Sequence, residues 1–119
     1  MQGTAEQPTP LSITQTTTAA GIRALVLDGE IDHDNAEQLR QSLRVDADGP
    51  ARFVLELSAV TFMDSTAISV LIVANNAAEE ASGWIRLAAM SEPVQRVVEI
   101  VRLDTVLTCY PTLCQALAD

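Results

Sequence analysis

The sequence predicts a single α/β domain, in which about four helices pack on a mixed β-sheet of about five strands. Three observations support this fold class. Short apolar runs alternate with helical patterns along the chain, the first two runs are spaced as a hairpin, and 119 residues are enough for one hydrophobic core. Because 48% of the residues are hydrophobic and only 3% are aromatic, aliphatic side chains must fill that core.

Residues 1–10 are predicted to be a disordered lead, and residues 11–119 to be the folded domain. The lead is polar and contains two prolines, so it cannot bury enough apolar surface to offset the cost of ordering. It also lacks the basic start and the apolar stretch of a signal peptide, so we expect a cytoplasmic protein. The longest apolar stretch, residues 67–74, is far shorter than the roughly 18 to 20 residues that cross a membrane.

The first elements follow from turn residues and periodicity. Residues 11–17 and 22–27 are two short runs separated by a small turn, which predicts a hairpin whose second strand ends at residue 27. Asp34 and Glu37 then stand at the spacing of a capping box, in which two side chains bond the backbone at a helix start. Apolar residues also recur on one face, so a helix is predicted over residues 35–44.

The middle of the chain predicts a central strand followed by a long helix. Residues 52–57 form a short apolar run bounded by turn residues, as in a buried strand. Residues 65–81 are alanine-rich, and although residues 70–73 alone could equally be a buried strand, the length of the whole segment favours a helix. Gly83 is predicted to end this helix.

The last third of the chain predicts two more strands and two more helices. Residues 84–88 and 106–108 are the predicted strands, and residues 112–117 form a final helix. Between the strands, Ser91-Glu92-Pro93 opens a helix, since proline is favoured in the first helical turn. Four valines of this helix recur at the spacing of one helical face: Val94, Val97, Val98 and Val101. Two of them, Val97 and Val98, are predicted to lie in the core.

Charge and composition exclude several kinds of partner. Sixteen acidic residues against seven basic ones give a net charge of −9, which repels the phosphates of nucleic acids and of anionic lipids. We therefore expect neither nucleic acid nor a membrane surface as a partner. No glycine-rich phosphate loop and no metal-ligand cluster occurs in the sequence, so no cofactor and no metal are predicted. Cys109 and Cys114 lack the spacing of a redox or zinc pair and are interpreted as reduced thiols.

The most informative segment is residues 62–66, Phe-Met-Asp-Ser-Thr, between a predicted strand and a predicted helix. Asp64 is suited to cap that helix, because its carboxylate accepts hydrogen bonds from the free N–H groups of the first turn. Ser65 and Thr66 then place two hydroxyls at an accessible helix start. Local chemistry alone favours a structural role, in which these hydroxyls only fill the first turn.

Residues 55–66, Leu-Glu-Leu-Ser-Ala-Val-Thr-Phe-Met-Asp-Ser-Thr, resemble the signature of the anti-sigma factor antagonists, the bacterial single-domain members of the STAS family. Gly29-Glu30-Ile31-Asp32 is similar to a second segment of that family, and residues 89–94 with residues 101–103 are similar to a third. The three segments occur in the family's order and span nearly all of the chain. The resemblance implies a STAS-like fold of the class predicted above.

The resemblance also implies a function that needs no catalysis by this chain, so no enzyme is expected. In that family the unphosphorylated antagonist binds an anti-sigma factor that is also a serine kinase, and the sigma factor is released to direct transcription. The kinase phosphorylates the serine after the aspartate, here Ser65, and a PP2C-like phosphatase removes the phosphate. The expected partner-binding residues are Asp32, Asp64, Thr66 and Ala67, and the expected state is a monomer or weak dimer.

One departure from the family pattern concerns the choice of partner. Family members usually continue after the two hydroxyl residues with glycine, a large apolar residue and glycine, whereas this chain has Ala67-Ile68-Ser69. Two side chains therefore stand where a docking protein would otherwise meet bare backbone.

Two alternative functions fit some of the same residues. A serine hydrolase would use Ser65, His33 and an aspartate, but no Gly-x-Ser-x-Gly turn surrounds Ser65. A STAS scaffold or sensory-assembly protein would keep the fold without a direct role toward a sigma factor.

Overall fold

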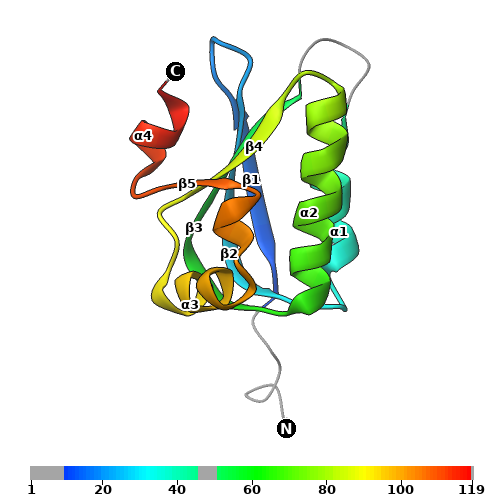
Figure 1. Cartoon of the computed structure of the whole chain (residues 1–119), viewed down its shortest axis with the longest axis vertical. Helices are drawn as coiled ribbons and strands as arrows, with labels where there is room; N and C mark the ends of the chain where they lie inside the picture. The colour runs from blue at the N-terminus through cyan, green and yellow to red at the C-terminus, as the bar shows by residue number, and fades with distance from the viewer. Residues whose placement is uncertain (1–9, 46–50, 119) are drawn as a thin grey trace, which may run out of the picture.

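A five-stranded sheet with the strand order β1-β2-β3-β4-β5 forms the centre of the computed structural model, which describes residues 10–45 and 51–118 (Figure 1). The strands are β1 (Ser12–Thr17), β2 (Arg23–Ile31), β3 (Arg52–Met63), β4 (Trp84–Ala88) and β5 (Thr108–Tyr110). The helices of the described residues are α1 (Ala36–Ser42), α2 (Ser65–Glu80), α3 (Glu92–Val101), α4 (Leu113–Leu117) and the short 3-10 helix η2 (Leu103–Thr105). The predicted fold class is confirmed. The predicted disorder of the lead falls on residues 1–9, which lie outside the described residues.

The sheet is mixed because only its first two strands form a hairpin. β1 is antiparallel to β2, and β2, β3, β4 and β5 run parallel to one another. Each parallel pair is joined by a crossover that contains α1, α2 or α3 in turn. The carboxyl ends of β2, β3 and β4 therefore lie at one edge of the sheet, the lower end of the molecule in Figure 1.

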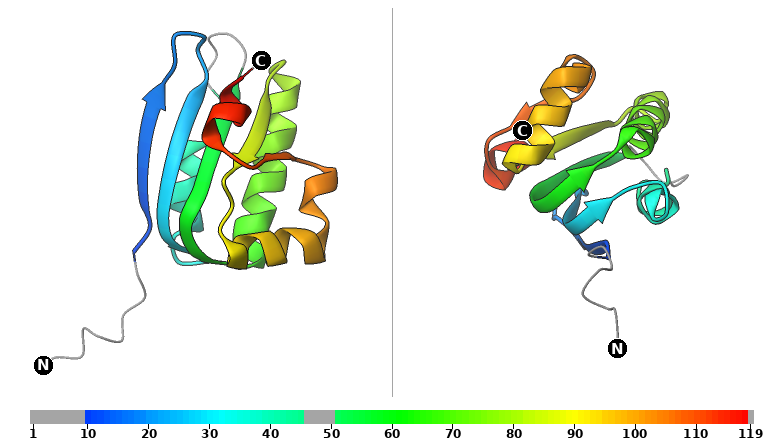
Figure 2. Two further views of the ribbon diagram at one scale, coloured as in Figure 1. Left: turned by 90° about the vertical axis from the view of Figure 1, so that its left-hand side faces the viewer. Right: turned by 90° about the horizontal axis from the view of Figure 1, so that it is seen from below.

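β3 occupies the centre of the sheet, and its first half is buried on both faces. Phe53 packs into the main core with residues of α1, α2 and α3, while Val54 packs on the opposite face with Ala116 of α4. Figure 2 shows α4 on the side of the sheet opposite α1 and α2. The predicted central strand is confirmed, although it continues beyond residue 57 to Met63.

β2 is longer than the sequence predicts. It does not end at residue 27 but continues through Asp28 and Gly29 to Ile31, because its pairing with β3 resumes after each of two register shifts. Gly29 has a φ of 113°, a backbone angle that favours glycine at such an irregularity. The turn residues that predicted the end of the strand therefore mark a bulge within it.

β5 begins later than the sequence predicts, at Thr108 rather than at residue 106. The backbone N–H groups of Val106 and Leu107 both donate to the carbonyl of Leu103 at 2.9 Å. These two residues therefore close the turn of η2 instead of pairing with β4. The apolar run alone does not distinguish the two outcomes.

The capping box predicted for α1 is wrong, although the helix itself forms. α1 begins at Ala36, and its N-cap residue is Asn35 rather than Asp34. Glu37 does not bond back to the helix start but pairs with Arg40, one turn along. Hydrogen bonding to Arg40 lowers the pKa of the Glu37 carboxyl below its ordinary value.

α2 forms over the segment for which length favoured a helix. Its buried residues recur at helical spacing and face the sheet: Ala67, Ile68, Leu71, Ala74, Asn75 and Ala78. Gly83 follows the helix as predicted, at a position that excludes a side chain. A Cβ there would lie 1.8 Å from the carbonyl oxygen of Ala51, where the chain passes from α2 into β4.

α3 is buried along a narrower stripe than its four valines indicate. Val94 and Val98 are buried, and Val97 packs only partly against the core. Val101, at the end of the helix, is 47% exposed. Leu103 is buried two residues later, because the chain turns into η2 at this point. The core position predicted for Val98 is confirmed, and that predicted for Val97 is confirmed in part.

Candidate functional site

The candidate site lies where the carboxyl ends of β2 and β3 meet. Ile31 pairs with Met63 at the last register position of these strands. Just beyond, the backbone N–H of Asp64 donates to the carbonyl of Ile31 at 3.1 Å. The loop that follows β2 and the segment that opens α2 are therefore held side by side, at the lower end of the sheet in Figure 1.

Asp64 joins these two segments through its carboxylate. Its Oδ1 accepts from the backbone N–H of Ala67 at 3.0 Å, which confirms the predicted cap of α2. Its Oδ2 accepts from the backbone N–H of His33 at 3.1 Å. His33 lies 31 residues away in the sequence, so this second contact depends on the sheet and not on local spacing.

Ser65 and Thr66 form the first turn of α2, and both are exposed. Within the described residues their backbone N–H groups have no acceptor, as is usual in a first turn. These N–H groups and the helix dipole favour a negative group at this point. Another protein can therefore reach the Ser65 hydroxyl, and the local backbone is suited to an added phosphate.

Asp32 stands in the loop that Asp64 holds in place. Its two sequence neighbours, Ile31 and His33, both hydrogen-bond to Asp64. The side chain of Asp32 is partly buried and accepts from the backbone N–H of Asp34 at 2.9 Å, which closes a tight turn. The structure brings Asp32 to the start of α2, while its role toward a partner stays a prediction.

Asn35 shapes the same loop, and sequence patterns did not single it out. Its Oδ1 accepts from the backbone N–H of Asp32 at 2.9 Å, and its Nδ2 donates to the carbonyl of Glu30 at 2.7 Å. The only sequence signal for this role is the general preference of asparagine for turns. Asn35 thus fixes the backbone that carries Asp32.

Ala67 is buried, whereas Ser65 and Thr66 are exposed. This corrects the prediction that Ala67 contacts a partner directly. Its side chain is fully buried against the core, and its backbone N–H is already bonded to Asp64. Position 67 shares the buried face of the helix with Leu71 and Ala74, so the tertiary packing covers it. Of the two positions where the family usually has glycine, only Ser69 presents a side chain to solvent.

Two exposed apolar side chains accompany the hydroxyls, and the sequence assigned neither a role. Phe62, near the end of β3, is 47% exposed, and Val73 of α2 is 64% exposed. Val73 follows Thr66 by seven residues and so lies on the same face of the helix.

The histidine of the chain does not form a hydrolase dyad. The side chain of His33 is 75% exposed, and its Nε2 lies 3.2 Å from the carboxylate of Asp34. Across residues 10–45 and 51–118, no hydrogen bond joins His33 to Ser65, and no group of His, Cys, Asp and Glu side chains is placed to hold a metal ion.

The two cysteines lie away from this site, near the carboxyl end of the chain. Cys109 and Cys114 are free, as the sequence predicts. Burial raises the pKa of the Cys109 thiol above its ordinary value, and the charge of Asp104 raises it further.

Comparisons with known proteins agree on the domain type. A model of the STAS domain matches residues 14–116. The anti-sigma-F factor antagonist RsfB of Mycobacterium tuberculosis is 30% identical over 98 residues, which cover 82% of this chain and 80% of that protein. A crystal structure of an anti-sigma factor antagonist from Mycobacterium paratuberculosis has a TM-score of 0.79 at 28% identity, covering 91% of this chain and 92% of the other.

A third comparison supports the fold alone. The structure of the anti-sigma factor antagonist SpoIIAA in its unphosphorylated form matches with a TM-score of 0.70. The match covers 88% of this chain and 92% of that chain, but the two are only 19% identical.

Among the helices of the described residues, none combines the length and apolar character that crossing a membrane requires.

Proposed function

Because this chain belongs to the STAS domain family, we propose that it acts as an anti-sigma factor antagonist. It binds an anti-sigma factor that is also a serine kinase, and the sigma factor is thereby freed. Phosphorylation of Ser65 ends the complex, and a PP2C-like phosphatase restores the binding form. The two mycobacterial proteins, whose names state this role, support the general function. The observation that best supports a phosphorylation switch is the exposed Ser65 hydroxyl at the capped start of α2.

Phosphate on Ser65 would act through charge rather than through refolding. It adds roughly −1.5 to −2 charges directly beside Asp64, on a chain whose net charge is already −9. The start of α2 stabilises a negative group, so the helix is expected to stay folded. A partner surface that fits the unmodified site then meets repulsion and an added desolvation cost.

The docking surface that we propose surrounds Ser65 and consists of Asp32, Asp64 and Thr66. The two carboxylates stand on segments that hydrogen bonds hold together, so they offer fixed acceptors to basic groups of the kinase. The chain itself contributes no catalytic group, because the kinase supplies both the ATP site and the phosphoryl transfer. Residues 11–119 form the proposed STAS unit, and its proposed place of action is the cytoplasm, where sigma factors direct transcription.

Release of a sigma factor tests the proposed function. The unphosphorylated chain is added to a preformed complex of the sigma factor and the anti-sigma kinase from the same organism. We expect the chain to co-elute with the kinase in size-exclusion chromatography and the freed sigma factor to support transcription in vitro. A chain phosphorylated beforehand is the control and should do neither. A chain that leaves the complex intact and sediments as a large assembly would contradict the proposal and favour a scaffold.

Asp32→Asn is expected to weaken kinase binding about tenfold with little effect on stability. Asparagine keeps the oxygen that accepts from the N–H of Asp34, so the turn persists while the charge is lost. Calorimetric titration measures the affinity, and a thermal melt checks the fold. Asp34→Asn is the matched control, because the side chain of Asp34 is exposed and its ion pair among the described residues is with the adjacent His33. Wild-type affinity in Asp32→Asn would remove Asp32 from the docking surface.

A further inference from the structure

β1 is an edge strand of the sheet and pairs with a neighbouring strand on one side only. β2 is that neighbour, and Figure 2 shows no helix or strand of the described residues beyond β1 on its other side. Within β1 only Ile13 is partly buried, and the remaining residues are exposed. Such an edge offers a row of unpaired backbone N–H and C=O groups to another strand.

Alternate residues of β1 direct these backbone groups outward. Just after β1, the N–H of Thr18 donates to the carbonyl of Ile22 on the opposite side of the hairpin at 2.9 Å. Hydrogen-bonded pairs recur at every second residue of an antiparallel ladder, so the even-numbered residues of β1 bond to β2. The backbone groups of Ile13, Gln15 and Thr17 therefore point away from β2. None of them has a partner among the described residues.

β1 also lacks the features by which edge strands usually avoid pairing. It contains no charged residue and no proline, and it pairs with β2 without a register shift. The opposite edge of the sheet differs, because β5 is only three residues long and Pro111 directly follows it. β1 is therefore the edge at which this sheet is open to a further strand.

The charge along this edge favours a second copy of the chain as the partner. No residue from 11 to 22 is charged, although the chain contains sixteen acidic residues and has a net charge of −9. Two copies that meet at this hairpin avoid most of the repulsion that their charged surfaces would cause. When the uncharged strand pairs with itself, no like charges face each other.

We propose that two copies of this chain pair through β1, antiparallel and across a two-fold axis, so that their sheets become one continuous sheet. The register that joins every outward residue of β1 to another places Gln15 opposite Gln15 of the second copy and Ile13 opposite Thr17. Thr14 then faces Thr16, a cross-strand threonine pair of the kind that stabilises a sheet. The same surface is used on both copies, so the contact closes at a dimer.

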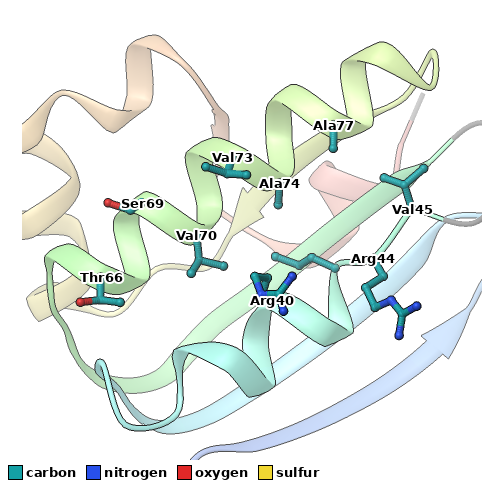
Figure 3. Close-up of a pocket in the computed structure, with 10 residues that line it drawn as sticks. Arg40, Arg44, Val45, Thr66, Ser69, Val70, Val73, Ala74 and Ala77 are labelled. Carbon is teal, nitrogen blue, oxygen red and sulfur yellow. The ribbon is translucent and has the colours of Figure 1, made fainter.

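Another apolar surface, the groove between α1 and α2, does not provide such a contact (Figure 3). Its volume is about 340 Å³, aliphatic side chains of both helices line it, and Arg40 and Arg44 border it. Because a groove is concave, two copies of it cannot fill one another, whereas two edge strands satisfy each other's backbone groups.

Sedimentation equilibrium of the isolated chain tests this inference. One six-residue edge buries less surface than the roughly 1,200 to 2,000 Å² of a stable interface, so we expect a dissociation constant on the order of 100 μM. The mean mass should rise with concentration and level off at the mass of a dimer.

Gln15→Pro should abolish this rise without unfolding the domain. The N–H that proline removes points away from β2, so the ladder within the chain is kept while the new pairing is blocked. A thermal melt checks the fold. Gln15→Ala keeps the N–H and should dimerise as the wild type does.

Charges at the two-fold position give a test that does not depend on proline. Gln15→Lys and Gln15→Glu should each weaken the dimer about fivefold or more, because like charges then face each other. An equimolar mixture of the two variants should restore dimerisation, since opposite charges then meet. Thr108→Lys and Thr108→Glu make the same changes in net charge at an exposed residue of β5, and each should dimerise as the wild type does.

A chain that stays monomeric up to about millimolar concentration would overturn the inference. So would a mass that rises past that of a dimer, or a mixture of the Gln15 variants that associates no better than either alone. If the wild type stayed monomeric and Gln15→Pro impaired kinase binding, β1 would belong to the interface with the kinase instead. Because no kinase is present in the sedimentation experiment, its failure leaves the proposed function standing.

Discussion

Ser65→Ala is expected to abolish phosphorylation of this chain by the anti-sigma kinase, while the affinity for that kinase stays within about threefold of wild type. The hydroxyl is exposed and makes no hydrogen bond within the described residues, so its loss leaves no buried group unpaired. Incubation with kinase and ATP should add one phosphate to the wild-type chain and none to the variant. Mass spectrometry measures the addition, and peptide mapping must locate it, because Thr66 is adjacent and also exposed.

Ser65→Glu is the complementary change and should weaken kinase binding at least about tenfold. A carboxylate reproduces part of the charge of a phosphate, and at the first turn of a helix it stabilises the helix. The melting temperature should therefore not fall, which separates loss of binding from loss of fold. Asn76→Glu adds the same charge to an exposed position farther along α2 and should bind normally. Phosphate mapped to Thr66, or normal phosphorylation of Ser65→Ala, would show that Ser65 is not the switch residue.

Val98→Asp is expected to unfold the domain or to lower its free energy of unfolding by about 4 kcal/mol. The side chain of Val98 is 1% exposed within the main core, so a carboxylate there would be buried without a partner. Because a domain of this size is stable by roughly 5 to 15 kcal/mol, the change removes much of its stability. Chemical denaturation followed by circular dichroism measures the difference.

Val101→Asp is the matched control for that prediction. It makes the same substitution in the same helix, at a side chain that is 47% exposed. We expect a loss of no more than about 1 kcal/mol, mainly from placing a negative charge near the carboxyl end of the helix. If both variants kept a cooperative transition near that of the wild type, the valine stripe of α3 would not be a core contact.

Capping and turn residues predicted the bounds of those helices and strands whose ends such residues mark. The structure confirms the capping aspartate at the start of α2, whereas the residue with a left-handed backbone after its end is Ser82, directly before Gly83. Of the boundaries that failed, the end of β2 depends on pairing with a distant strand, whereas the start of β5 depends on the turn of η2 just before it. β2 runs on to Ile31 because β3 lies beside it, and no property of residues 28–31 alone reveals that partner. A bulge and a strand end share the same turn residues, so only the register distinguishes them.

The features of the candidate site also fall into two groups: those that local chemistry predicts and those that depend on distant residues. The cap at Asp64 and the exposed hydroxyl of Ser65 follow from the chemistry of a helix start. The place of Asp32 beside them was expected only from the resemblance to a family, because Asp32 and Asp64 are distant in the sequence. They become neighbours through the pairing of Ile31 with Met63. The burial of Ala67 likewise depends on the sheet beneath α2, which no local pattern describes.

The sequence by itself determined the α/β class, the order of the elements, the capped start of α2 and the accessible hydroxyl of Ser65. Each of these rests on periodicity, turn chemistry or capping, which act over a few residues. Only the tertiary structure decided that His33 bonds to Asp64, that Ala67 is hidden and Ser69 exposed, and that α1 and α2 enclose an apolar groove with two arginines at its border. These features arise from parallel strands and crossover helices, which bring together side chains that no local pattern connects.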